Sequence, residues 1–254
     1  MALFSDIKHS VTYPFNDSNW LHKLWPLPLI AAMPLVGLVS IILLKGWRFE
    51  MVRNLANGVD DLPDFDLVLF FKRGLILWAV MLGHIFVPAV VCGLLGIGGP
   101  LGFVADIYEI VTSGFSAWAR SEPSDWLLTL LVYAIWAVIS FPVFQTGMIR
   151  YALSNDWKSM LNAPLNTLLF IRYMHLFIKF YLCWLILSLM ILCTDLLLAA
   201  TGIGLLLIPV FTVCVYYISS AHELGHLARR MNRLGRTSEQ QTAAAPLTAD
   251  NSTS

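Results

Sequence analysis

Residues 46–88, GWRFEMVRNLANGVDDLPDFDLVLFFKRGLILWAVMLGHIFVP, decide the fold class because they join a polar, charged stretch to a long apolar run. The apolar run is long enough, and poor enough in charge, to indicate a membrane. The polar stretch carries several Lys and Arg residues, which collect on the cytoplasmic side of a bilayer. The stretch therefore predicts a membrane protein and also its orientation.

The composition of the whole chain supports the same class. The 254 residues are 58% hydrophobic and 13% charged, with a mean hydropathy of +0.72. An average soluble domain is about 25% charged. This chain therefore cannot cover itself with polar groups, and lipid must be the solvent for most of it. The formal net charge is zero, so there is no electrostatic reason to expect binding to nucleic acid.

The apolar runs predict an all-α membrane protein, a bundle of about five transmembrane helices with interfacial amphipathic helices. The predicted spans are about 26–44, 74–97, 126–146, 177–199 and 202–220. An interfacial helix is expected within the outer loop, residues 100–125.

These spans form a helical domain over residues 25–236. It follows a polar, interfacial segment at residues 1–24 and precedes a tail at 237–254 whose composition is typical of disorder. Three prolines interrupt the first apolar run, so a re-entrant segment is the alternative to a first span.

The positive charges predict the orientation. Thirteen of the sixteen Lys and Arg residues fall on one side of the alternating spans, and only Lys8, Lys23 and Arg120 fall on the other. The positive-inside rule assigns the thirteen to the cytoplasm. The sequence therefore predicts a multi-pass protein of the cell membrane with its N-terminus outside and its C-terminus in the cytoplasm. A re-entrant first segment would move the N-terminus inside.

The polar residues before the second span, 45–73, are expected to form a cytosolic loop in which Gly58 gives a turn. Its acidic residues are expected to offset nearby basic ones. A solvated, salt-bridged cap is the simpler interpretation. A docking surface for a cytosolic partner at residues 46–66 is the alternative, and membrane lipids are the other expected partner.

A resemblance to a known family rests on the same stretch. Short features follow one another in this order: Gly46-Trp47, Arg53-Asn54, Gly58, Asp60-Asp61, Leu62-Pro63, Asp64-Phe65, Gly74-Leu75 and Pro88. With PFNDSNW at residues 14–20, they resemble a family of prokaryotic multi-pass membrane proteins catalogued as a domain of unknown function, DUF4013. The resemblance covers about residues 14–230. It implies an integral membrane bundle with no established activity, and it supplies no catalytic residues.

One short motif carries candidate chemistry. His222-Glu223-Leu224-Gly225-His226 matches the zinc-binding pattern H-E-x-x-H. On a helix, residues i and i+4 lie on one face, so the imidazoles of His222 and His226 can meet at one zinc ion. Glu223 can then act as the catalytic base toward the zinc-bound water.

The motif is incomplete by itself, because a catalytic zinc needs three protein ligands. His175, a loop carboxylate, Glu239 and Asp250 are candidates for the third, and the spacing favours none of them. The motif also lies at the cytosolic end of the last span, where His, Glu and Arg are ordinary. The sequence therefore favours a structural exit helix without a cofactor. A membrane-embedded zinc metalloprotease is the alternative.

A second group of polar residues bears on lipid binding. Arg172, His175 and Lys179 share one helical face by their spacing. Snorkelling toward the inner headgroups is the simpler interpretation, and recognition of an anionic lipid headgroup is the alternative. The sequence thus predicts an integral membrane protein of unknown biochemical activity, with a role as a scaffold, a lipid-interacting protein or a small carrier.

Overall fold

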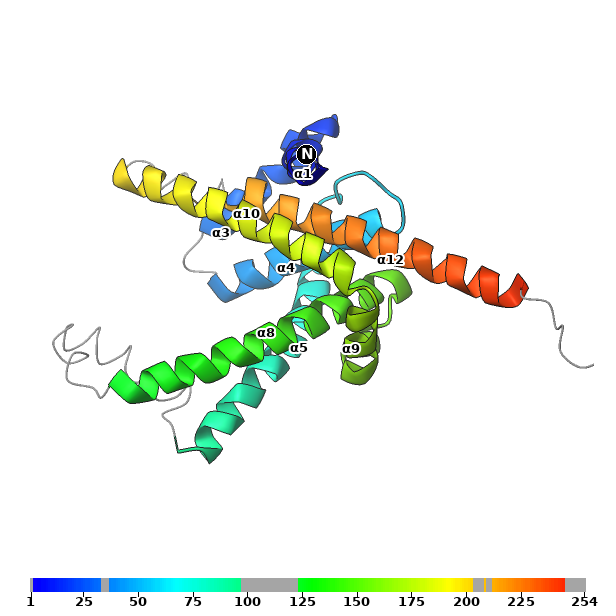
Figure 1. Ribbon diagram of the computed structural model, residues 1–254. Coiled ribbons are helices and arrows are strands. Elements are labelled where there is room, and N and C mark those ends of the chain that lie inside the picture. Colours follow the sequence, from blue (N-terminus) through cyan, green and yellow to red (C-terminus); the bar gives the residue numbers. More distant parts are fainter. Residues whose placement is uncertain (1, 33–36, 97–122, 203–207, 209–211, 245–254) are drawn as a thin grey trace, which may run out of the picture.

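The computed structural model describes residues 2–32, 37–96, 123–202, 208 and 212–244 (Figure 1). Every regular element in these residues is helical, as the sequence predicts. The elements are α1 (Ala2–Thr12), η1 (Tyr13–Asn16), α2 (Trp20–Leu24), α3 (Pro26–Ala32), α4 (Gly37–Ala56), α5 (Leu67–Leu94), α8 (Pro123–Ser154), η3 (Trp157–Met160), α9 (Ala163–Arg172), α10 (Met174–Ala200), η5 (Thr212–Tyr217) and α12 (Ile218–Ala244).

Three of the described helices, α5, α8 and α10, are long and apolar enough to cross a membrane. They correspond to the predicted spans at 74–97, 126–146 and 177–199, and they indicate an integral membrane protein. Each helix begins before its predicted span. α5 begins at Leu67 because the Asp66 side chain accepts a hydrogen bond of 3.0 Å from the Leu69 N–H and caps the helix.

The first predicted span, residues 26–44, is not one helix. α3 ends at Ala32, α4 begins at Gly37, and α3 folds back against α4 (Figure 1). With seven residues, α3 is about 10 Å long, far short of a hydrocarbon core about 30 Å thick. The apolar run is thus divided between two helices that pack against each other, an arrangement that favours the re-entrant alternative over a first span.

The N-terminal segment lies on the same side of the molecule as the connector between α4 and α5. The Tyr13 hydroxyl donates a hydrogen bond of 2.9 Å to the Asp60 carbonyl oxygen. The Lys23 ammonium donates one of 3.0 Å to the Leu62 carbonyl oxygen. Direct contacts of this kind cannot cross a bilayer. These contacts therefore join the N-terminal segment directly to the connector, whereas the sequence predicts that the two lie on opposite sides of the membrane.

Two glycines bring α4 and α5 into backbone contact. A Cβ at Gly46 would overlap the Phe70 carbonyl group, and a Cβ at Gly74 would overlap the Ile42 carbonyl group. Both helices can therefore approach until their backbones touch. α4 also packs against α12 and α8, which places it at the centre of the bundle.

The connector before α5 is shorter than predicted. Residues 46–56 are not loop but the end of α4, and Trp47, Phe49 and Met51 within them are fully buried. α4 ends where Gly58 adopts a left-handed φ of +89°, as the predicted turn requires. The true connector is therefore residues 57–66.

The last part of the chain is described in pieces. The predicted span at 202–220 is described only in part, because residues 203–207 and 209–211 lie outside the described residues. The interfacial helix expected at 100–125 falls mostly on residues 97–122, which also lie outside them. η5 is a π-helix that leads directly into α12. α12 continues to Ala244, so it extends beyond the predicted start of the tail at residue 237.

Candidate metal centre

The H-E-x-x-H motif lies in the first three turns of α12. Leu224 is fully buried and faces the core. Gly225 lies against α4, where any side chain at this position would collide with Leu55. The opposite face of α12 carries His222 and His226, whose Nε2 atoms are 3.0 Å apart. The sequence therefore fixes both the face that packs and the face that carries the imidazoles.

A third histidine joins this pair from the other end of the chain. α1 packs against α12 and brings His9 to the site. Its ring centroid is 5.2 Å from that of His222 and 6.3 Å from that of His226. The candidate ligand atoms of the three histidines all lie within 4.8 Å of one another. His9 is the residue that sequence reasoning missed, because nothing in its spacing connects it with a motif on α12.

Ser10 orients the first histidine of the motif. Its hydroxyl oxygen lies 2.8 Å from His222 Nδ1 and 2.5 Å from the Glu223 carboxylate. Because the hydroxyl has one proton to donate, it donates to Glu223 and accepts from Nδ1–H of His222. This tautomer leaves a lone pair on His222 Nε2, the atom that faces His226.

Burial keeps the motif histidines neutral. Only 1% of His222 is exposed, and desolvation, with smaller contributions from His226 and His9, lowers its pKa from 6.5 to about 3. Desolvation also lowers the pKa of His226. Neutral imidazole is the form that binds a metal. Desolvation raises the pKa of Glu223, which suits a carboxylate that must accept a proton near neutral pH.

The three histidines and Glu223 line one cavity of about 100 Å³. Its other walls come from α1, α10 and α12 and include Asp6, Lys179 and Arg230. The Tyr13 ring lies against His222, with ring centroids 4.4 Å apart. The cavity is thus large enough for a few water molecules or a small polar group, and it opens beside the candidate ligands.

The donor set fits zinc. Three imidazoles that leave one position open are the ligand arrangement of catalytic zinc sites. The predicted ligands His222 and His226 lie together, and the predicted base Glu223 shares their cavity. Of the other suggested third ligands, His175 lies on α10, is exposed and does not belong to this cluster. Asp250 and the side chain of Glu239 lie outside what the structure describes.

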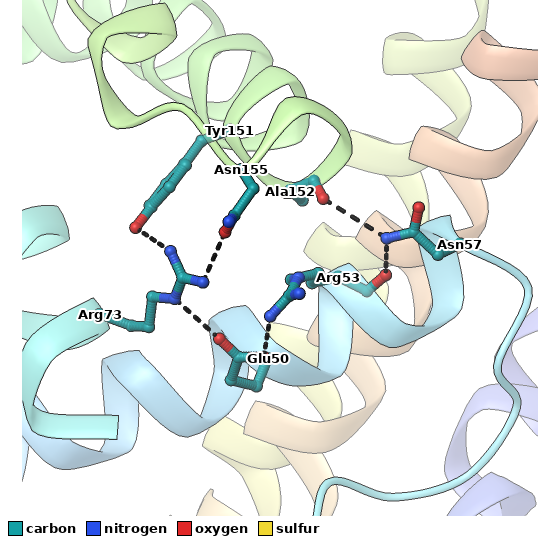
Figure 2. A network of polar contacts seen from close by, with 7 residues as sticks. All are labelled: Glu50, Arg53, Asn57, Arg73, Tyr151, Ala152 and Asn155. Atoms are coloured by element: carbon teal, nitrogen blue, oxygen red, sulfur yellow. Dashed lines mark hydrogen bonds and ion pairs between the residues drawn. The ribbon is translucent and has the colours of Figure 1, made fainter. Parts of the chain in front are cut away.

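A second polar cluster, shown in Figure 2, ties α4, α5 and α8 together. Glu50 is 4% exposed, and its carboxylate accepts hydrogen bonds of 3.0 Å from both Arg53 and Arg73. Arg73 also donates to the Tyr151 hydroxyl and to the Asn155 side chain. The ion pairs join α4 to α5, and the neutral acceptors Tyr151 and Asn155 connect Arg73 to α8 and its C-terminal end, so the network stabilises the packing of the three helices.

The acidic residues of the connector pair with distant parts of the chain. Asp60 forms an ion pair of 3.1 Å with Arg229 on α12, and Asp64 forms one of 3.3 Å with Lys23. The expected offsetting of charge therefore occurs, but through residues that lie far away in the sequence. Binding of a cytosolic partner at residues 46–66 stays a prediction. Of these residues, 46–56 belong to α4, and only 57–66 form the connector.

The predicted lipid-facing group of Arg172, His175 and Lys179 does not lie on one helix, because α9 ends at Arg172 and α10 begins at Met174. Lys179 turns toward α1, where it pairs with Asp6, and it lines the metal cavity. The Arg172 guanidinium instead lies over the Tyr173 ring, 5.6 Å from its centroid. The helical face that the spacing suggests therefore does not act as one unit.

Comparison with known proteins gives one match. A family model described as "Protein of unknown function (DUF4013)" matches residues 29–208. No curated protein and no solved structure matches the chain. The matched range contains α5, α8 and α10 but neither His9 nor the motif on α12.

Proposed function

Since the chain belongs to the DUF4013 family, whose description assigns no activity, we propose a function from its own residues: a membrane-bound, zinc-dependent hydrolase. His9, His222 and His226 are the proposed metal ligands, and Glu223 is the proposed general base. The observation that carries the proposal is the meeting of three imidazoles beside a carboxylate in one cavity.

The proposed chemistry uses water as the nucleophile. Zinc lowers the pKa of a coordinated water to about 7 in hydrolases. Glu223 takes one proton from the attacking water, and the water oxygen bonds to the electrophilic carbon or phosphorus of the substrate. The bond to the leaving group breaks, and Glu223 passes its proton to that group. The net change is the addition of one water across the cleaved bond.

Ser10 is a proposed positioning residue in this mechanism. Its bonds to His222 and Glu223 hold the ligand and the base in a fixed relation. Replacing it should weaken zinc binding through the tautomer of His222. It should also change the pH dependence of hydrolysis through the freedom of Glu223.

The proposed location is the cytoplasmic edge of the membrane, with both ends of the chain inside. The contacts of Tyr13 and Lys23 with the connector support this orientation. It also places Lys8 and Lys23 with the thirteen basic residues already assigned to the cytoplasm. α3 and the first turns of α4 then form a re-entrant hairpin, which is tolerated where its backbone is covered by protein.

The test of the proposed function separates binding from chemistry. The detergent-purified full chain, loaded with zinc, should hydrolyse a simple activated ester such as p-nitrophenyl acetate or p-nitrophenyl phosphate. Glu223→Gln should keep the zinc and lose at least about a hundredfold in rate. Zinc binding without hydrolysis in the wild type would instead favour a structural metal that joins α1 to α12. Without zinc binding, the scaffold, lipid-interacting and carrier roles are what remain.

A further inference from the structure

Two basic side chains from different helices face the candidate metal cavity. Lys179 comes from the second turn of α10, and Arg230 lies on α12, one turn beyond His226. Both are close enough to Glu223 to lower its pKa against the dominant effect of burial. The motif pattern requires neither residue, so their presence beside the metal ligands needs a separate explanation.

The charge of the cavity favours an anion. Glu223 and Asp6 are its two carboxylates, and Lys179 and Arg230 balance them. A divalent metal on three neutral imidazoles adds two positive charges that no side chain lining the cavity offsets. A neutral peptide bond makes no use of this excess, whereas a phosphate group carries the matching charge and enough oxygen acceptors for a metal, a lysine and an arginine.

The cavity also borders a candidate membrane span. Its apolar walls are Leu176, Phe180 and Leu227, and the first two lie in the opening turns of α10, one of the candidate spans. The opening turns of a membrane span lie at the depth of the lipid headgroups. The polar and apolar walls therefore match a phosphate attached to an acyl-bearing group.

We propose that this cavity binds the phosphate of its substrate, with Lys179 and Arg230 contacting the phosphate oxygens beside the metal. The proposal rests on the hydrolase function above and names its substrate class, a phosphate ester. A lipid headgroup and a soluble phosphate ester offer the same chemistry, and the apolar walls favour the lipid.

Asp6 occupies the place of the phosphate in the substrate-free protein. Its carboxylate forms the ion pair with Lys179. An incoming phosphate must displace it, so Asp6 competes with the substrate for the same cation. Removal of this carboxylate should therefore strengthen phosphate binding, whereas removal of either cation should weaken it.

The test is isothermal titration calorimetry on the zinc-loaded full chain in detergent, after free zinc has been removed. Three probes are titrated: dioctanoyl phosphatidic acid, dioctanoylglycerol with the same tails and no phosphate, and inorganic phosphate. The variants are Lys179→Met, Arg230→Gln and Asp6→Asn. Lys158→Met and Arg236→Gln serve as matched controls, because both residues are exposed and lie outside the cavity.

We expect phosphatidic acid to bind and dioctanoylglycerol not to bind. Lys179→Met and Arg230→Gln should each weaken binding about tenfold or more. Asp6→Asn should strengthen it by up to about fivefold, and the controls should match the wild type. Tighter binding of phosphatidic acid than of inorganic phosphate identifies the lipid as the source, and equal binding points to soluble esters.

Equal binding of dioctanoylglycerol and phosphatidic acid, or affinities that Lys179→Met and Arg230→Gln leave unchanged, would overturn the proposal. Hydrolysis of a peptide substrate at the same rate in both variants as in the wild type would do the same. Zinc content is measured on the same samples. A wild type that holds zinc but binds no phosphate refutes this inference alone, whereas a wild type without zinc refutes the proposed function.

Discussion

His9 and His222 lie near opposite ends of the chain, and their ring centroids are 5.2 Å apart in an edge-on arrangement. The contact arises because α1, near the N-terminus, packs against α12 beside the motif. It also completes a three-imidazole cluster that the motif alone leaves at two.

The first prediction concerns the metal. The wild type should bind about one zinc per chain, and His9→Ala should lose it as completely as His222→Ala or His226→Ala, because a site with two ligands holds zinc weakly. Zinc in the detergent-purified protein is measured by plasma mass spectrometry. His22→Ala is the matched control, since His22 is exposed and outside the cluster. Full zinc content in His9→Ala would exclude His9 as a ligand.

The second prediction concerns pH. In the metal-free folded protein the pKa of His222 is about 3, against 6.5 when unfolded. Below pH 6.5 the His222 imidazole is protonated in the unfolded chain but stays neutral in the folded chain until the pH approaches 3. Stability should therefore fall on acidification toward pH 3, by at most about 1.4 kcal/mol per pH unit. Thermal unfolding in EDTA at several pH values measures this slope. His222→Gln should flatten it, and an unchanged slope would mean that other groups cause it.

The third prediction concerns the contact of α4 with α5. Gly46→Ala and Gly74→Ala should each destabilise the protein by about 1–3 kcal/mol or more, because the new methyl group meets backbone rather than a movable side chain. Gly83→Ala is the control on the same helix as Gly74, since nothing lies within 4 Å of its Cβ position. Thermal unfolding in detergent compares the variants. Equal melting temperatures for Gly74→Ala and Gly83→Ala would refute the close approach.

The fourth prediction concerns the buried ion pair of Figure 2. Glu50→Gln should cost about 3–5 kcal/mol, because it leaves the Arg73 guanidinium, whose side chain is 13% exposed, without its anion. Asp64→Asn should change stability by less than about 1 kcal/mol, since the Asp64 side chain is 95% exposed. Denaturant unfolding of both variants gives the comparison. If both variants lose less than about 1 kcal/mol of unfolding free energy, the Glu50 cluster contributes little to stability.

The fifth prediction concerns topology. In a cysteine-free background, Lys8→Cys and Arg236→Cys should react with a membrane-impermeant maleimide from the same side of intact cells or vesicles. Leu95→Cys, at the far end of α5, should react from the other side. The contacts of Tyr13 and Lys23 with the connector require this result. Labelling of Lys8→Cys from the same side as Leu95→Cys would instead support the sequence-based prediction of an external N-terminus.

Sequence pattern alone predicted the helical class and three of the spans, because the length and apolarity of a span are local properties set by the bilayer. It also predicted the turn at Gly58, where the left-handed backbone favours glycine. It placed His222, Glu223 and His226 at one surface, because i, i+1 and i+4 spacing fixes their relation on a helix.

Only the tertiary structure brings His9 to the motif and the N-terminal segment to the connector. His9 reaches the site because α3 folds back against α4 and returns the N-terminal segment to the side of the connector. Hydropathy does not predict this fold-back, because an apolar run of the same length can form either a membrane span or a re-entrant hairpin. A contact between two distant segments leaves no periodicity in either of them, so only the packing of α1 on α12 brings the three histidines together.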